Sequence, residues 1–164
     1  MIRPLSEEDL EAYAILRRQS LVEEPLSFGA SPSDDVPVEA LRASMRRAPD
    51  WMLFGAFVDG ALVGAAGLLR SHHVKTAHAM HLWGMYVAPP HRQCGLGRAL
   101  IDACIAHARS LPGVTVVQLG VTSAAAEARR LYEAAGFRVW GTQPDALRYE
   151  GQAVDEHHMA LALV

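Results

Sequence analysis

The segment from residue 79 to residue 113 constrains the fold most, because it joins two regular elements through a stretch that suits neither. AMHLWGMYV (79–87) is an apolar run typical of a strand. PPHRQCGLGR (89–98) follows, and its two prolines and two glycines disfavour both helix and strand. Apolar residues then recur at helical spacing until Pro112-Gly113 stops them: Leu100, Ile101, Cys104, Ile105, Ala108 and Leu111. The sequence therefore predicts a strand, a specialised loop and an amphipathic helix.

Hydrophobic periodicity and turn residues place the other elements around this segment. A strand is expected over residues 2–5, and Ser6 with Asp9 gives the capping-box pattern that opens a helix through about Leu21. The further expected elements are a helix at 38–47, strands at 51–58 and 61–69 joined through Asp59-Gly60, a strand at 114–121, a helix along 124–135, and strands at 138–143 and 157–164. The order βααβββαβαββ predicts an α/β fold, with a mixed sheet and helices on both faces.

The strand expected over residues 114–121 shows no polar alternation at its start. VTVVQLGV is β-branched and apolar over most of its length, so we expect it to be buried on both faces of the sheet. Sheets that contain parallel strands bind ligands beyond the strand ends, where neighbouring chains diverge. The loop 89–98 leaves the central strand at such a place.

Composition limits the class of protein. The 164 residues predict a single domain over positions 1–164, with no linker or internal repeat. Cys94 and Cys104 belong to no CxxC or Cys/His cluster, which favours free thiols in a reducing compartment. No signal-peptide pattern and no long apolar run is found, so we expect a cytoplasmic protein that does not enter a membrane. The net charge of −3 argues against a general nucleic-acid surface.

The loop 89–98 has the properties of an anion site. A helix that begins after it presents unpaired backbone N–H groups and a partial positive charge. Gly95 and Gly97 carry no side chains that would keep a phosphate from this backbone, and Arg92 adds a full charge. The glycines alone are equally compatible with a tight strand-to-helix turn. The pattern matches neither a Walker loop nor a dinucleotide fingerprint, because no Lys-Ser/Thr follows and position 100 is Leu.

Two segments together resemble a known family. MYVAPPHRQCGLGRAL is similar to the acetyl-CoA-binding signature of the GCN5-related N-acetyltransferases, in which V-x-P is followed by R-x-x-G-x-G and a helix. LGVTSAAAEARRLYEAAGF is similar to the second signature, which ends in A-x-x-L-Y-x-x-x-G-F. The resemblance implies a mainly antiparallel central sheet of about seven strands in the GNAT-like arrangement. One departure is Ala125, which stands where the family often has Asn.

The resemblance also implies a coenzyme site. Backbone N–H groups would hold the pyrophosphate of acetyl-CoA, with the Arg92 side chain nearby; they belong to Gln93, Cys94, Gly95, Leu96, Gly97 and Arg98. The pantetheine arm would pair with the central strand along Met85, Tyr86 and Val87. The second segment would contribute Ala128 and Arg129, and Arg129 with Arg130 would reach the 3′-phosphate. The alternative for these two arginines is a solvated helix face paired with nearby glutamates.

The resemblance implies direct transfer of acetyl to a primary amine through a tetrahedral intermediate. Tyr132 occupies the motif position of the general acid, although a Tyr at that spacing alone is typical of a core. His81 stands where relatives often have a basic Glu, and its alternative is a structural histidine. Glu156 and His158 are secondary candidates for acid/base work. No metal site is assigned, because His78 and His81 would face opposite ways on a strand.

The acceptor is not determined by the sequence. In this fold the region from Leu21 to Arg47 would wall the acceptor site, and its acidic residues could draw a cationic amine or form an ordinary solvated loop. A small-molecule amine and a peptide or protein amine remain equally admissible, and a homodimer is plausible by resemblance. Two alternatives stay open for the whole chain: an acyl-CoA-binding module without turnover, and an unrelated phosphate-binding α/β protein.

Overall fold

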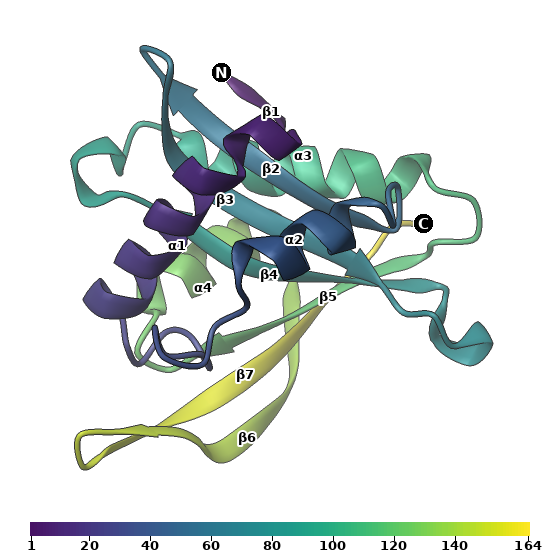
Figure 1. Cartoon of the computed structure of the whole chain (residues 1–164). Coiled ribbons are helices and arrows are strands. Elements are labelled where there is room, and N and C mark those ends of the chain that lie inside the picture. Colours follow the sequence, from purple (N-terminus) through teal and green to yellow (C-terminus); the bar gives the residue numbers. More distant parts are fainter.

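The computed structural model describes all 164 residues as one mixed seven-stranded sheet with helices on both faces (Figure 1). The strand order is β1-β2-β3-β4-β5-β7-β6, and β4 with β5 is the one parallel pair. The strands are β1 (Ile2–Pro4), β2 (Trp51–Val58), β3 (Ala61–Arg70), β4 (Ala79–Val87), β5 (Val116–Thr122), β6 (Arg138–Tyr149) and β7 (Gln152–Ala162). The helices are α1 (Leu10–Glu23), α2 (Val38–Met45), α3 (Leu96–Ser110) and α4 (Ala126–Ala134), with short 3-10 turns at Glu7–Asp9, Val74–Thr76 and Pro89–His91. The predicted order is confirmed.

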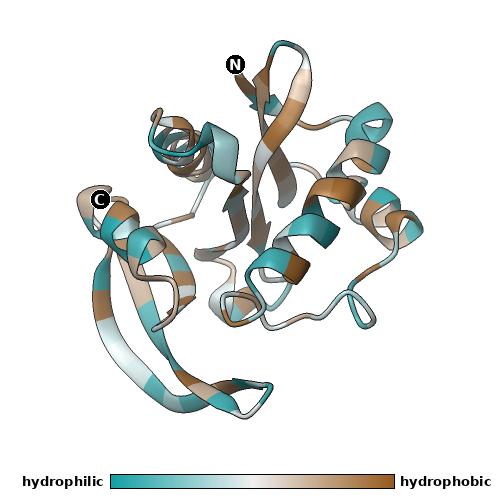
Figure 2. Cartoon of the chain, turned by 90° about the vertical axis from the view of Figure 1, so that its left-hand side faces the viewer, coloured by the Kyte–Doolittle hydropathy of each residue, from teal (hydrophilic) through white to brown (hydrophobic).

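Two apolar layers hold the helices to the sheet. The larger layer packs α3 and α4 against one face, where Leu100, Ile101 and Cys104 meet Leu82 and Val117. The smaller layer packs α1 and α2 against the other face of β2 and β3. Figure 2 shows the strands running between these two helical layers. No helix is long and apolar enough to span a bilayer.

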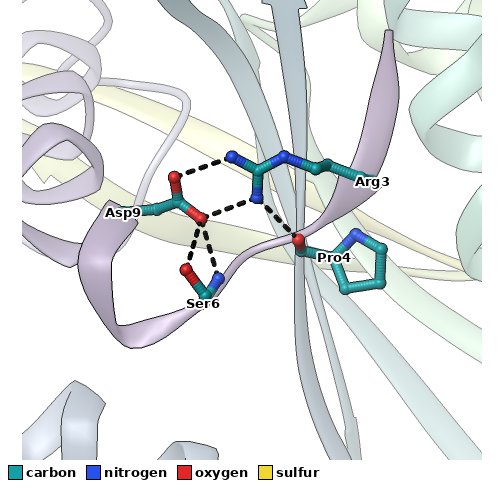
Figure 3. Close-up of polar contacts among 4 residues, drawn as sticks. All are labelled: Arg3, Pro4, Ser6 and Asp9. Atoms are coloured by element: carbon teal, nitrogen blue, oxygen red, sulfur yellow. Dashed lines mark hydrogen bonds and ion pairs between the residues drawn. The ribbon is translucent and has the colours of Figure 1, made fainter.

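The predicted capping box is present at the start of the chain (Figure 3). Asp9 Oδ2 accepts hydrogen bonds from the Ser6 backbone N–H at 2.8 Å and from the Ser6 hydroxyl at 3.1 Å. Arg3 donates to both oxygens of the same carboxylate, from Nη1 at 2.7 Å and Nη2 at 2.9 Å. These hydrogen bonds hold the pKa of Asp9 well below its usual range. Asp9 therefore joins β1 to the start of the first helical segment.

A bulge and a divergence shape the centre of the sheet. The pairing of β3 with β4 shifts register between Ala65 and Gly67, and Gly84 there adopts a left-handed backbone with φ +62°. The parallel pairing of β4 with β5 ends at His81, which lies opposite Gln118. Beyond this pair the two strands separate, so the backbone of Met85 has no partner on β5. The divergence expected where the loop 89–98 leaves the central strand is present.

Two expectations about the last three strands need correction. β5 was expected to be buried on both faces, and this is wrong: Val117, Leu119 and Val121 are buried, whereas Gln118 and Gly120 are exposed. The reason is that α1 and α2 pack over β2 and β3 and leave this part of their face of the sheet open. β6 and β7 are also longer than expected, and they form a hairpin that extends away from the rest of the sheet (Figure 1).

Candidate active site

A cavity of about 830 Å³ opens where β4 and β5 diverge. Its walls are the end of α1 with the following residues 24–27, the end of β4, the loop before α3, and one side of α4 with the residues that precede it. Most of the predicted coenzyme residues line it: Met85, Tyr86, Val87, Arg92, Gln93, Gly95, Gly97, Arg98 and Ala128. The structure therefore brings the two sequence signatures to one cavity. Sequence reasoning missed the contribution of residues 24–27, because nothing local connects that segment to the loop before α3.

The N-terminus of α3 forms one end of this cavity. Gly95 caps the helix in a left-handed conformation with φ 85°, and Gln93 has φ 60°. The first backbone N–H groups of α3 have no carbonyl one turn earlier to bind, so they remain available as donors. A Cβ at Gly97 would lie 2.9 Å from Leu131 Cδ2 and 3.3 Å from Met85 Cε, so this glycine permits close packing of α3 against α4 and β4. The arrangement suits an anion bound by the main chain.

Arg92 is bonded to the protein on two sides. Its Nε donates to the carbonyl oxygen of Val87 at 2.7 Å, and its Nη2 pairs with Glu24. The guanidinium also lies 5.5 Å from the centre of the Tyr86 ring. Arg92 therefore connects the loop before α3 to the end of β4 and to the end of α1, in addition to any charge that it offers a ligand.

The other predicted coenzyme residues differ in their placement. Arg98 donates from Nε to Asp102 at 2.9 Å, and Arg129 donates from Nε to Glu133 at 3.0 Å. Arg129 also lies 3.3 Å from His157 Nε2 and does not line the cavity, whereas Arg130 does. Leu96 is half-buried against the larger core, and Cys94 is exposed.

Ala125 is the N-cap of α4 and lines the cavity. Its methyl group cannot donate or accept a hydrogen bond, so the cap position offers no side-chain contact to a ligand in the cavity. Backbone groups and the nearby cations are the polar partners that remain on this wall.

Tyr132 belongs to the larger core and does not line the cavity. The residue is 5 % exposed, and its ring packs edge-on against Phe137 with the ring centres 5.8 Å apart. Burial raises the pKa of Tyr132, so its hydroxyl stays protonated at neutral pH. The hydroxyl makes no hydrogen bond within the protein. A protonated hydroxyl with spare hydrogen-bonding capacity is a suitable proton donor.

His81 lies at the apex of the divergence between β4 and β5 and is exposed. Partial loss of solvent lowers its pKa, the carboxylate of Glu156 opposes this shift, and His158 adds to the lowering. The imidazole is therefore favoured in its neutral form, which can accept a proton.

The acidic residues between positions 23 and 35 are all engaged within the protein. Glu23 accepts from the Tyr86 hydroxyl and from Gln19, which lowers the pKa of its carboxyl. Glu24 pairs with Arg92, and Asp34 accepts from the Ser31 backbone. The last one is Asp35, which pairs with Arg17 at 3.1 Å. Each of these carboxylates thus has a partner within the protein. The expectation that they draw a cationic amine therefore loses its support.

A second cavity, of about 240 Å³, lies between α1, residues 32–38 and β4. Arg17 and Trp83 are part of its wall, and Arg17 Nη1 and Trp83 Nε1 have no hydrogen-bond partner. Arg17 Nη1 would lie 3.5 Å from a Cβ at Gly84, so this wall adjoins the bulge of β4. The region that the sequence predicted to wall an acceptor site therefore lies beside the divergence.

Several solved structures share the architecture of this chain. The chain is similar to an acetyltransferase of the GNAT family from Streptococcus pneumoniae, with TM-score 0.87, 20 % identity, and 99 % of this chain and 98 % of that chain covered. It is similar to ribosomal-protein-alanine N-acetyltransferase from Brucella melitensis, with TM-score 0.84, 25 % identity and 99 % of each chain covered. It is also similar to a GNAT superfamily phosphinothricin acetyltransferase from Sinorhizobium meliloti in complex with acetyl-CoA, with TM-score 0.85, 20 % identity, and 99 % and 87 % covered.

The family follows from the sequence match. Residues 14–137 match the family model described as acetyltransferase (GNAT) family, which is most of the chain and includes both signatures. The protein belongs to the acetyltransferase (GNAT) family, and the resemblance inferred from the sequence is confirmed.

Proposed function

We propose that the protein is an N-acetyltransferase that transfers acetyl from acetyl-CoA to a primary amine by direct attack. The observation that carries this proposal is the cavity of about 830 Å³ in which the exposed N-terminus of α3 and the unpaired backbone of Met85 meet. A pyrophosphate fits the first of these and an extended pantetheine amide chain fits the second. Membership of the family and the acetyl-CoA complex of the Sinorhizobium meliloti protein support the choice of co-substrate.

The chemistry has three requirements that the site can meet. The acceptor ammonium must lose a proton before its lone pair can attack, and His81 is the proposed base. The oxyanion of the tetrahedral intermediate needs a donor, for which the Met85 backbone N–H lies at the divergence. The departing thiolate takes a proton from Tyr132, the proposed acid. Each group acts at a different atom of the same reaction.

The runner-up function is an acyl-CoA-binding module without turnover, which the absence of an Asn amide at position 125 favours. An amine library assayed by thiol release separates the two functions. An N-acetyltransferase gives thiol release that depends on a primary amine and saturates with it. Binding of acetyl-CoA with thiol release at the amine-free rate for every amine would establish the module instead.

A further inference from the structure

Three titratable side chains from neighbouring strands share the uncovered face of the sheet. His81 on β4 is opposite Gln118 on β5, and Gly120 on β5 is opposite His158 on β7. Residues paired in register lie on the same face, and side chains two positions apart on one strand also share that face. His81, His158 and Glu156 therefore all project toward the side that α1 and α2 leave open.

Gly120 determines where the Glu156 carboxylate lies. Glu156 is paired with Thr122, yet its side chain turns back across β5. A Cβ at Gly120 would meet Glu156 Cδ at 2.7 Å and Cγ at 3.3 Å. The carboxylate therefore occupies the volume that any other residue at position 120 would fill. This path leads it from β7 across β5, in the direction of β4 and His81.

The Glu156 carboxylate has no basic partner other than histidine. Its Oε1 lies 3.8 Å from His158 Nδ1, and no lysine or arginine pairs with it. The side chain is 29 % exposed, so a ligand can reach it from the open face. His158 is in turn held by the Trp140 ring, with the ring centres 5.4 Å apart. Among the acids around the divergence, Glu156 thus differs from Glu23, Glu24 and Asp35, which are neutralised or bonded within the protein.

We propose that Glu156, laid across β5 over Gly120, binds the ammonium group of the acceptor at the apex of the divergence and directs its proton to His81. The inference rests on the proposed function and extends it to the acceptor. One N–H bond of the ammonium breaks, its electron pair stays on nitrogen, and the proton moves to the neutral imidazole of His81. The nitrogen lone pair then forms the bond to the acetyl carbon, and the carbonyl electron pair moves to oxygen. When the carbonyl re-forms, the C–S bond breaks, the thiolate takes a proton from Tyr132, and the nitrogen loses its remaining extra proton to solvent. The site would select aliphatic amines, which are cationic at neutral pH, over weakly basic aromatic amines.

The charges that face His81 give this proposal a distinctive pH dependence. They come from Glu156, which raises the pKa of His81, and from His158, which lowers it. Activity falls at low pH because a protonated imidazole cannot accept the ammonium proton. Removing the Glu156 charge lets the pKa of His81 fall further, so the acid limb of kcat/KM moves to lower pH. A Glu156 that only supports the fold would leave this limb in place.

The test compares variants by thiol release with one aliphatic primary amine that the wild type accepts. Glu156→Gln should raise KM for the amine about tenfold, the loss typical of a charge-assisted contact, and leave KM for acetyl-CoA unchanged. Gly120→Ala should act in the same direction, because its methyl group displaces the carboxylate. Gly141→Ala is the matched control. Gly141 on β6 pairs with His158 as Gly120 on β5 does, and a Cβ at position 141 meets nothing within 4 Å.

The outcomes are distinguishable. Unchanged amine KM and an unmoved acid limb in Glu156→Gln overturn the inference, as does equal behaviour of Gly120→Ala and Gly141→Ala. Thermal unfolding identifies a Gly120→Ala protein that has not folded, and Glu156→Gln then decides alone. If no amine raises thiol release by the wild type above the amine-free rate, the proposed function fails and the inference falls with it. Amine-dependent release without any effect of the variants overturns the inference and leaves the proposed function standing.

Discussion

Arg92 Nε donates a 2.7 Å hydrogen bond to the carbonyl oxygen of Val87, the last residue of β4. The same guanidinium pairs with Glu24, which follows α1. One side chain therefore joins three parts of the cavity wall: the loop before α3, the end of the central strand, and the segment after α1. In the family signature this position suggests a ligand contact, and the structure adds a scaffolding role to it.

Replacing Arg92 should weaken acetyl-CoA binding. Arg92→Ala removes a cation and a charge-assisted hydrogen bond, together worth about 1 to 2 kcal/mol, so we expect the Kd for acetyl-CoA to rise about tenfold. Glu24→Gln serves as the control, because it keeps the Arg92 cation and removes its counter-charge. Calorimetry measures both. A Glu24→Gln variant that binds as weakly as Arg92→Ala would show that the ion pair, rather than the cation, is required.

Comparing substitutions at Gly95 and Gly151 distinguishes backbone strain from an effect on ligand binding. Its φ of 85° resembles the φ of 78° at Gly151 in the β6–β7 turn, and a Cβ at either position meets nothing within 4 Å. We expect Gly95→Ala and Gly151→Ala each to lower the free energy of unfolding by about 1 kcal/mol through left-handed strain. Gly95→Ala alone should also weaken acetyl-CoA binding, because its methyl group stands at the α3 N-terminus. If the two variants bind acetyl-CoA with equal affinity, the pyrophosphate does not bind at this loop.

The sequence predicts the features that local patterns specify. The strand ending at Val87, the loop with Gly95 and the capping box of Ser6 and Asp9 each follow from residues within one segment, and all three are present. Periodicity also places the helices to within a few residues. Caps and turns are local, so one sequence is sufficient for them.

The features that the sequence does not predict depend on residues far apart in the chain. Arg92 pairs with Glu24 across 68 positions, and no local signal relates them. The open face of β5 depends on where α1 and α2 pack, which decides that Gln118 is exposed while the apolar pattern around it favours burial. The position of the Glu156 carboxylate depends on Gly120, thirty-six residues earlier on another strand. Local signatures therefore identify the loop before α3, whereas tertiary contacts decide how Arg92 and Glu156 are held.

Cys94 lies between Gln93 and Gly95, which both line the cavity, so it should report on occupancy of the cavity. Cys94 is exposed and its Sγ lies 2.6 Å from the carbonyl oxygen of His91, while burial raises the pKa of Cys104 to about 12. A thiol-alkylating reagent near neutral pH should therefore label Cys94 selectively, since the thiolate is the nucleophile. We expect labelling to block acetyl-CoA binding, and acetyl-CoA to slow labelling. Mass spectrometry follows both, with Cys94→Ser as the unlabelled control; equal rates with and without acetyl-CoA would contradict this placement.

Asp9 should make stability depend on pH. Its pKa is lowered in the folded protein, so its contribution is present above the ordinary Asp pKa of about 4 and is lost as the pH falls toward the folded value. Asp9→Asn should lower the free energy of unfolding by about 1 kcal/mol at neutral pH, as the loss of a helix cap does, and by less in acid. Urea unfolding at neutral pH and near pH 3 measures the difference. If wild type and Asp9→Asn differ in unfolding free energy by the same amount at both pH values, the effect does not come from the titration of this carboxyl.

Tyr132→Phe tests the proposed acid with little risk to the fold. The hydroxyl has no protein partner and the ring packs on Phe137, so the variant should keep its unfolding free energy and its affinity for acetyl-CoA. Loss of the proton donor should lower kcat about 100-fold, at the lower end of the usual contribution of a general acid. The raised pKa of Tyr132 implies that wild-type activity shows no basic limb from this group at moderately alkaline pH. Unchanged kcat in the phenylalanine variant would assign Tyr132 to the core alone, and the thiolate would then leave without help from this side chain.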